Sequence, residues 1–374
     1  MRYRGIALAL VALFLASVAR FYHPGTGFTA LIGFPEGHEY EAPALRAIPH
    51  FDYPAWASYD GQFYAQRALD PLLRDPEVDH AMDLPPYRAR RILFSWTAFV
   101  LGLGRPAWIL EAYALQNVAC WLLLAVLLTR WIPLDSLSRV SLWAACLFSH
   151  GLLWSVRFAL LDGPSLLLIA CAIAAVESGR PVLAGAVTGI SGLARETNLI
   201  AALALPVPFG RRGWVRACVA LILIALPLVV WEDYLRSIYR STIFAGADQL
   251  VMPGKALVAI WWQVLSSLPR TPYGAAALLC VLAPLAVQAA YIVVTRKYSA
   301  PWWRVAAGYA VLMLLLDPVL ADPRTGAITR VLLPLTVGFN VLLAGEPRPA
   351  RFWIWFAAGN LHLIPALQVM PLLP

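Results

Sequence analysis

The residues YDGQFY, Tyr59 to Tyr64, place one carboxylate, Asp60, among aromatic and amide side chains. A carboxylate beside aromatic rings is partly desolvated, so we expect the pKa of Asp60 to be raised toward the range in which it accepts a proton during a reaction. The alternative is a turn made by Asp60 and Gly61, with the aromatic side chains resting on a membrane surface. The rest of the sequence has to decide between these two interpretations.

The composition is that of a polytopic membrane protein. The chain has 374 residues, of which 60% are hydrophobic and 13% are charged, with a mean hydropathy of +0.68, whereas soluble proteins are about 45–50% apolar and about 25% charged. The net charge is +8, but only two of the 29 basic residues are Lys and many arginines separate hydrophobic runs. That pattern indicates cytoplasmic loops, so we expect membrane lipids as partners and no nucleic acid.

The YDGQFY stretch lies in a long polar segment that follows the first apolar run, Gly5 to Ala19. Residues 23–86 hold ten of the 21 carboxylates, and a connection of this length is usually functional or disordered. Its many aromatic residues favour an ordered loop apposed to the membrane, with a short helix over residues 62–73. The apolar segment that follows, Ile92 to Leu103, spans only roughly 18 Å as a helix, too short for a bilayer core of about 30 Å. We therefore predict a first periplasmic loop over residues 23–106 that includes an interfacial helix.

Clear hydrophobic spans follow, and two shorter apolar arms, residues 182–193 and 199–209, flank the sequence Arg195-Glu196-Thr197-Asn198. If the short basic connections face the cytoplasm, the parity of the topology requires these two arms to cross separately. The result is an all-α polytopic fold of about 11 transmembrane helices, a single membrane domain over residues 1–374 with its C-terminus outside. Residues 232–273 form a second large periplasmic loop with an interfacial helix over residues 256–268. The spans are predicted at residues 107–128, 140–155, 164–176, 214–231, 274–294, 303–316, 328–343 and 352–369.

This topology brings four polar clusters to the periplasmic face: Asp60, the connection 157–162, the tip 195–198 and the connection 317–324. Charges inside a membrane cost about 2.5–3.5 kcal/mol each on insertion scales, so Arg195 and Glu196 should pair or face a cavity. One interpretation is a structural ion pair that closes a hairpin. The other is an arginine that binds an anionic phosphate, because a planar guanidinium fits phosphate oxygens.

Motifs for nucleotide-driven or serine-hydrolase chemistry are missing from the sequence: it has no Walker A, GxGxxG or GxSxG pattern. The five cysteines lie inside apolar runs without a CxxC pair, which argues against a disulfide framework and a zinc site built from cysteines. Metal sites made from His and carboxylates in the first loop stay open, although no spacing such as HExxH supports one.

The stretch Tyr59 to Tyr64 resembles the Trp-Asp-Gly-x-Trp/Phe-Tyr motif of the mannosyltransferase branch of the integral-membrane GT-C glycosyltransferases. The stretches 87–93 (YRARRIL) and 193–197 (LARET) are similar to bacterial membrane proteins of cell-surface glycopolymer formation. The resemblance covers most of the chain in layout but only these three short stretches in motif. It implies a GT-C-like bundle in the bacterial inner membrane, with a lipid-linked sugar as donor.

The resemblance also implies roles for individual residues. Asp60 would be the general base for the acceptor hydroxyl, or would organise a divalent metal ion as in metal-dependent members, so that no cofactor is certain and a metal remains open. Asp162 would be a second catalytic acid, although its spacing from Arg157 departs from the family pattern. The remaining residues would bind the donor phosphate or the acceptor: Tyr59, Gln62, Tyr64, Arg88, Arg91, Arg195 and Glu196.

The function that follows is an inverting transfer of a sugar from a polyprenyl-phosphate donor to a cell-surface glycan or lipid acceptor on the periplasmic face. Such a transfer needs a base near the acceptor oxygen and positive charge on the departing phosphate. One rival is a transporter or flippase of lipid-linked glycans, which would need charges distributed through the membrane depth. Another is a non-catalytic assembly subunit.

Overall fold

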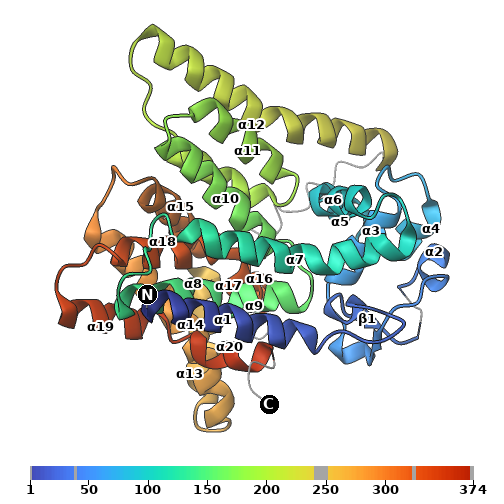
Figure 1. Cartoon of the computed structure of the whole chain (residues 1–374), viewed down its shortest axis with the longest axis horizontal. Coiled ribbons are helices and arrows are strands. Elements are labelled where there is room, and N and C mark those ends of the chain that lie inside the picture. Colours follow the sequence, from blue (N-terminus) through green and yellow to red (C-terminus); the bar gives the residue numbers. More distant parts are fainter. Residues whose placement is uncertain (1, 38–39, 240–251, 322–325, 371–374) are drawn as a thin grey trace.

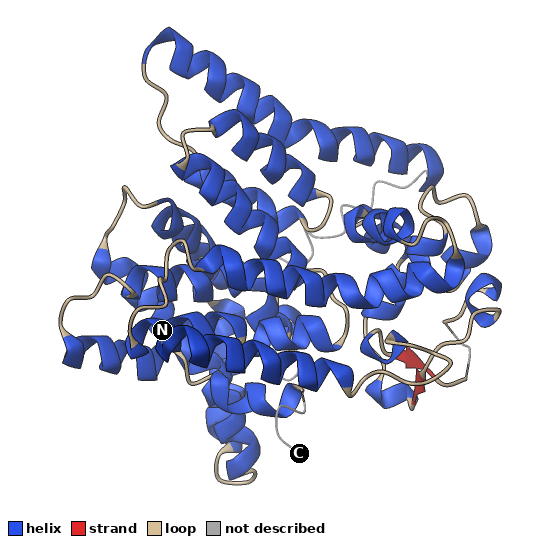
Figure 2. Cartoon of the chain, viewed as in Figure 1, coloured by secondary structure: helices blue, strands red, loops and turns tan. Residues whose placement is uncertain are grey.

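The protein is a helical bundle with an ordered polar region at one end, as its computed structural model shows (Figures 1 and 2). The structure describes residues 2–37, 40–239, 252–321 and 326–370. Within these ranges the only β-sheet is a parallel pair, β1 (Phe34–Pro35) and β2 (Asp52–Tyr53). The predicted all-α class is confirmed.

Three described helices are long and apolar enough to cross a membrane: α7 (Pro106–Leu128), α12 (Gly210–Tyr239) and α14 (Pro272–Thr295). A fourth candidate is the pair α19 (Pro349–Gly359) and α20 (Leu363–Val369), which is bent by 45°. These helices are compatible with a membrane protein, and α7 and α14 match the predicted spans closely.

Prolines begin many of the bundle helices. Pro106, Pro181, Pro272, Pro301 and Pro349 each occupy the first turn of a helix, where a missing N–H costs nothing and a fixed φ favours helical geometry. The helices that start at Pro181 and Pro301 are α11 (Pro181–Gly192) and α15 (Pro301–Leu315). The sequence thus marks the helix starts directly.

Several expected spans are broken into two helices. The predicted span 140–155 is divided into α8 (Leu137–Leu147) and α9 (His150–Arg157), and the span 328–343 into α17 (Ala327–Val331) and α18 (Leu333–Leu343). The two arms after residue 181 are also separate, because α11 is followed by the 3₁₀ helix η3 (Glu196–Ala204). Other bundle helices are α1 (Arg2–Ala19), α10 (Asp162–Glu177), α13 (Lys255–Ser267) and α16 (Pro318–Ala321).

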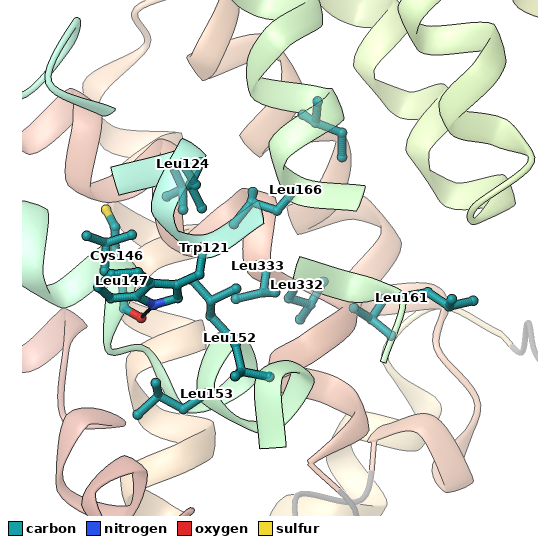
Figure 3. Close-up of a cluster of buried hydrophobic side chains, with 14 of the residues drawn as sticks. Trp121, Leu124, Cys146, Leu147, Leu152, Leu153, Leu161, Leu166, Leu332 and Leu333 are labelled. Atoms are coloured by element: carbon teal, nitrogen blue, oxygen red, sulfur yellow. Dashed lines mark hydrogen bonds between the residues drawn. The ribbon is translucent and has the colours of Figure 1, made fainter. Parts of the chain in front are cut away.

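A core of large apolar side chains joins α7, α8, α9, α10 and α18 (Figure 3). Trp121 of α7 stacks on Phe14 of α1 with ring centroids 3.8 Å apart, and its indole N–H donates to the carbonyl of Leu147 over 2.8 Å. Leu161 lies in the same cluster, directly before Asp162. Packing in the core therefore fixes the backbone from which Asp162 projects.

The described part of the first loop is built from short elements. They are η1 (Thr29–Leu31), α2 (Pro43–Arg46), η2 (Ala55–Ala57), α3 (Gly61–Leu69), α4 (Pro76–His80), α5 (Pro85–Arg90) and α6 (Leu93–Leu101), together with the two strands. The nine residues of α6 span about 14 Å, and α6 packs against α3 and α7. In Figure 1 these elements lie at the right, whereas the connections α7–α8, η3–α12, α14–α15 and α18–α19 lie at the left.

The predicted second loop begins later than expected, because α12 continues to Tyr239 instead of ending near Trp231. Its last turns dock on the first loop. The indole of Trp231 donates to the carbonyl of Ala89 over 2.9 Å, and Glu232 accepts from Arg90 at 2.5 Å. Tyr239 donates to Asp79 over 2.9 Å. These polar contacts stabilise the last turns of α12, which hydropathy alone does not predict to be helical. Residues 240–251 of the predicted loop lie outside the described residues.

Candidate functional site

The YDGQFY stretch lies at the start of α3, pressed against two other backbone segments. A Cβ on Gly61 would lie 2.1 Å from the carbonyl oxygen of Phe158 and 2.8 Å from that of Ile32. Only glycine permits this approach. Tyr59 also donates its backbone N–H to Gly33 over 3.3 Å. The glycine of the motif therefore brings Asp60 next to the segment that precedes Asp162.

Asp60 is held by Arg88 of α5. Its carboxylate does not cap α3 but accepts from Nη2 of Arg88 at 2.9 Å. Arg88 also binds Asp83 at 2.7 Å and donates to the hydroxyl of Tyr64 over 3.3 Å. Its guanidinium lies 4.6 Å from the centre of the Phe63 ring. The guanidinium of Arg88 is therefore hydrogen-bonded to two carboxylates.

The pKa of Asp60 is lowered, which corrects the expectation from the aromatic sequence context. Burial raises the pKa, as expected, but the charge and hydrogen bond of Arg88, and beyond it the charges of Arg330 and Arg91, more than offset burial. Asp60 is therefore a carboxylate at neutral pH, stabilised in its ionised form.

Asp162, the first residue of α10, lies between two arginines. One carboxylate oxygen accepts from Nη1 of Arg195, and the other accepts from Nη1 of Arg330 at 3.0 Å. The residue is only 4% exposed. Its backbone is fixed by Asn117, which donates to the carbonyl of Leu160 over 2.7 Å, and by Ser155, which accepts from the Gly163 N–H at 2.8 Å. This geometry suits a residue that positions the two guanidinium groups.

Arg330 joins the two halves of the site. Its Nη2 donates to the hydroxyl of Tyr59 over 2.8 Å, so the motif in the first loop and Asp162 share one arginine. Arg330 projects from the short helix α17, which packs very closely on α9: a Cβ on Gly151 would lie 2.4 Å from the carbonyl oxygen of Thr329. A glycine again permits the approach that places a functional side chain.

Arg91 and Glu196 form a third pair. Nε of Arg91 lies 3.3 Å from a carboxylate oxygen of Glu196, and its Nη1 donates to the hydroxyl of Tyr87 over 2.7 Å. Glu196 also lies 3.5 Å from Arg90. Arg195 and Glu196 are both paired, as the ion-pair interpretation expects, but not with each other. Arg195 pairs with Asp162, and Glu196 pairs with arginines of the first loop.

These residues surround one small cavity. Its charged lining consists of three arginines (Arg91, Arg195 and Arg330) and two aspartates (Asp60 and Asp162), which leaves an excess of one positive charge. The other lining residues are Tyr64, Tyr87, Leu160, Leu161, Leu320 and Ala327. In the described part of the chain, the buried Nε groups of Arg195 and Arg330 have no hydrogen-bond partner. Buried donors without partners are costly, and an anion in the cavity would satisfy them.

Most of the predicted site residues meet here, but not all. Tyr59, Arg88 and Glu196 flank the lining as second partners of its charged groups, whereas Gln62 is 4% exposed and does not line the cavity. Arg157 lies apart and donates to the carbonyl of Ala30 over 3.2 Å. Asp317 accepts from a backbone N–H in its own turn. Residues 322–324 of the predicted connection lie outside the described residues.

Arg330 is not among the site residues expected from the sequence. Tyr87 is not among them either. The available signal was one arginine near the start of the apolar run 328–343, because a charge in such a run is usually buried with a partner. Both carboxylates that line the cavity are bonded to arginines, so the arrangement favours anion binding over metal binding.

Comparison of the chain with protein-family models, with curated proteins and with solved structures found no match.

Proposed function

We propose that this chain is an inverting glycosyltransferase of the GT-C type. It transfers a sugar from a polyprenyl-phosphate donor to a cell-surface glycan or lipid acceptor on the periplasmic face of the bacterial inner membrane. The observation that carries the proposal is the cavity in which the carboxylate of Asp60 faces Arg91, Arg195 and Arg330, residues far apart in the sequence. A base beside an anion-binding cluster is what such a transfer requires.

The arginines would hold the phosphate of the donor. Asp162 fixes Arg195 and Arg330. Each of these arginines keeps a buried Nε–H that can donate a hydrogen bond to a phosphate oxygen. Arginine binds phosphate with a planar set of donors. As the bond between the anomeric carbon and the phosphate oxygen breaks, the electron pair stays on the phosphate, and the positive cluster stabilises the developing charge.

Asp60 would accept the proton of the attacking hydroxyl. The oxygen of the acceptor forms a bond to the anomeric carbon from the side opposite the leaving phosphate, so the configuration inverts. A carboxylate with a lowered pKa is a weak base, and it receives the proton only as the new C–O bond forms and the hydroxyl becomes strongly acidic. Arg88 keeps Asp60 ionised before this step.

The proposal includes eleven membrane passes. Single helices would provide six (α1, α7, α10, α12, α14 and α15), the divided spans α8–α9, α17–α18 and α19–α20 three, and the short pair α11 and η3 two. This path puts the connections at the left of Figure 1 in the cytoplasm and the first loop, with the cavity, in the periplasm.

The flippase alternative is disfavoured by one observation: the five charged side chains that line the cavity around Asp60 lie together beside the first loop, where Arg91 meets Glu196 and Asp60 meets Arg88. A flippase would need them distributed along a path. A non-catalytic assembly subunit has no need of a base beside an anion site.

The test is transfer of radiolabel from a panel of polyprenyl-phosphate sugars in membranes that contain the protein. The proposal expects incorporation into a glycan or lipid acceptor that is absent without the protein and is strongly reduced in Asp60→Asn. Movement of the labelled lipid across the bilayer without any transfer would support the flippase instead. A lack of both would indicate an assembly subunit.

A further inference from the structure

We propose that Glu41, His50 and Asp52 bind a divalent transition metal ion, best matched by Zn²⁺, that ties the first loop together outside the cavity. The three side chains each offer one ligand atom, and these atoms all lie within 4.8 Å of one another. The site is independent of the proposed transferase activity, because none of its residues lines the cavity around Asp60.

The tautomer of His50 points to a ligand. Its Nδ1 lies 2.6 Å from the carbonyl oxygen of Ile48, which can only accept, so Nδ1 carries a hydrogen. Its Nε2 is directed at two carboxylate oxygens, 3.2 Å from Glu41 and 3.1 Å from Asp52. In neutral His50 this nitrogen is itself an acceptor. Three acceptors that converge on one point repel one another unless a cation lies between them.

The distances fit a metal ion. A proton on Nε2 that is shared between the two carboxylates would also give separations of about 2.7–3.2 Å, so zinc binding, and not distance, distinguishes the two. Zinc at about 2.0–2.1 Å from tetrahedral ligands separates those ligands by roughly 3.3 Å. The observed separations of 3.1 and 3.2 Å are close to that value. The hydrogen bond from Nδ1 to a backbone carbonyl is also the usual outer contact of a metal-bound histidine.

Burial strengthens the argument. The Glu41 side chain is 0% exposed and that of His50 is 6% exposed, so a carboxylate is desolvated beside an imidazole. Buried charged groups in proteins are paired with other groups or coordinate metal ions. The Asp52 side chain is 36% exposed, which leaves an open side for a water molecule as fourth ligand.

The metal would fix the segment that leads to Asp60. Asp52 is in β2 and pairs with Phe34 of β1, while Glu41 lies two residues before α2. One ion would therefore join β2 to the segment that precedes α2. Tyr59 follows β2 by six residues and is itself bonded to Gly33, beside β1. We assign the metal a structural role in this loop.

The experiment is a measurement of zinc in purified protein. The full chain is isolated in detergent with an affinity tag that contains no histidine, treated with EDTA, loaded with ZnSO₄, washed, and analysed by inductively coupled plasma mass spectrometry. The variants are His50→Ala and Asp52→Asn, and the matched control is His80→Ala, which removes an exposed histidine of the same loop. Thermal denaturation with and without ZnSO₄ is a second readout.

We expect about one zinc per chain in the unmodified protein and in His80→Ala, and a zinc-dependent rise in the denaturation midpoint in both. His50→Ala should lose the bound zinc and the rise. Asp52→Asn should bind zinc at least roughly tenfold more weakly, because even the outer contacts of a metal site contribute about 10–100-fold to metal affinity. The side chain of Asp52 is more exposed than that of His50, so this substitution disturbs folding less. Absence of zinc binding by the unmodified protein, or equal binding by His50→Ala or Asp52→Asn, would overturn the proposal.

Discussion

Asp162 accepts a hydrogen bond from Arg195 with one carboxylate oxygen and from Arg330 with the other. The three residues belong to three parts of the chain, at the start of α10, at the tip between α11 and η3, and in α17. Two buried guanidinium groups would repel each other without the carboxylate between them. Asp162 therefore holds the two arginines side by side at the cavity.

Replacing Asp162 with Asn should destabilise the protein and weaken donor use. Removal of one charge from a buried pair costs on the order of 3–5 kcal/mol, here because two arginines are left facing each other. The measurement is the thermal denaturation midpoint in detergent, together with transfer activity. Asp135→Asn is the control, since it breaks an exposed pair with Arg139. Equal midpoints for the two variants would contradict the positioning role of Asp162.

Replacing Arg195 with Lys should weaken use of the donor in a normally inserted protein. Lysine keeps the charge and can pair with Asp162, but it loses the second donor of the guanidinium, so we expect the KM for the donor to rise by about tenfold, as for one charge-assisted hydrogen bond. Transfer is measured against donor concentration. Arg130→Lys, which changes an exposed pair with Glu177 at the other end of the bundle, should leave KM unchanged. Full activity of Arg195→Ala would mean that the arginine only closes a hairpin.

Replacing Gly61 with Ala should disrupt the site without changing any charge. The new methyl group would overlap the carbonyls of Phe158 and Ile32, which are backbone atoms and cannot simply rotate away. We expect a lower denaturation midpoint and loss of transfer. Gly5→Ala is the matched control, because nothing lies within 4 Å of its Cβ position and alanine favours a helix. A Gly61→Ala protein as stable and active as Gly5→Ala would refute the close approach.

The pH dependence of transfer should report the lowered pKa of Asp60. A general base works while it is deprotonated, so activity is lost as the pH falls through that pKa, and a lowered pKa moves this loss to more acidic pH. Because Arg88 and the other arginines lower the pKa, the acidic limb should lie below the ordinary aspartate value of about 3.9. We therefore expect constant kcat/KM from about pH 5 upward.

The matched variants are Arg88→Met and Arg74→Met. Without Arg88, burial is less strongly opposed and the pKa of Asp60 rises, so the acidic limb should move to higher pH. Arg74 is exposed in the same loop and its loss should not move the limb. An acidic limb near pH 6 in the unmodified protein would show that burial outweighs the arginines.

Local patterns in the sequence predicted several of the helices and identified residues that lie together in the structure. Prolines and apolar runs mark α7 and α14, and the short apolar run after Arg91 predicted a helix too short to span a membrane. Parity of the basic connections predicted that Asp60, Asp162 and Arg195 would lie on one face, and the structure brings all three to one cavity.

Other features depend on contacts that no local pattern encodes. Arg88 lowers the pKa of Asp60. It follows Asp60 by 28 residues and lies beside it because of the position of α5. The extension of α12 is stabilised by the ion pair between Glu232 and Arg90, which are far apart in the sequence. Arg330 was not predicted as a site residue, because its partners Tyr59 and Asp162 precede it by 271 and 168 residues.

The most direct test of the central claim is the activity of Asp60→Asn. Asparagine has nearly the same volume and can still accept a hydrogen bond from Arg88, which also keeps its bond to Asp83, but it cannot take a proton. Asp70→Asn is the control, because among the described residues the Asp70 carboxylate accepts hydrogen bonds only from the backbone N–H groups of Arg74 and Asp75. The account predicts that Asp60→Asn loses about 10²–10⁴ in the rate of sugar transfer, with normal abundance in the membrane and retained donor binding, while Asp70→Asn stays active. Equal transfer by Asp60→Asn and the unmodified protein, or equal loss in both variants, would contradict it.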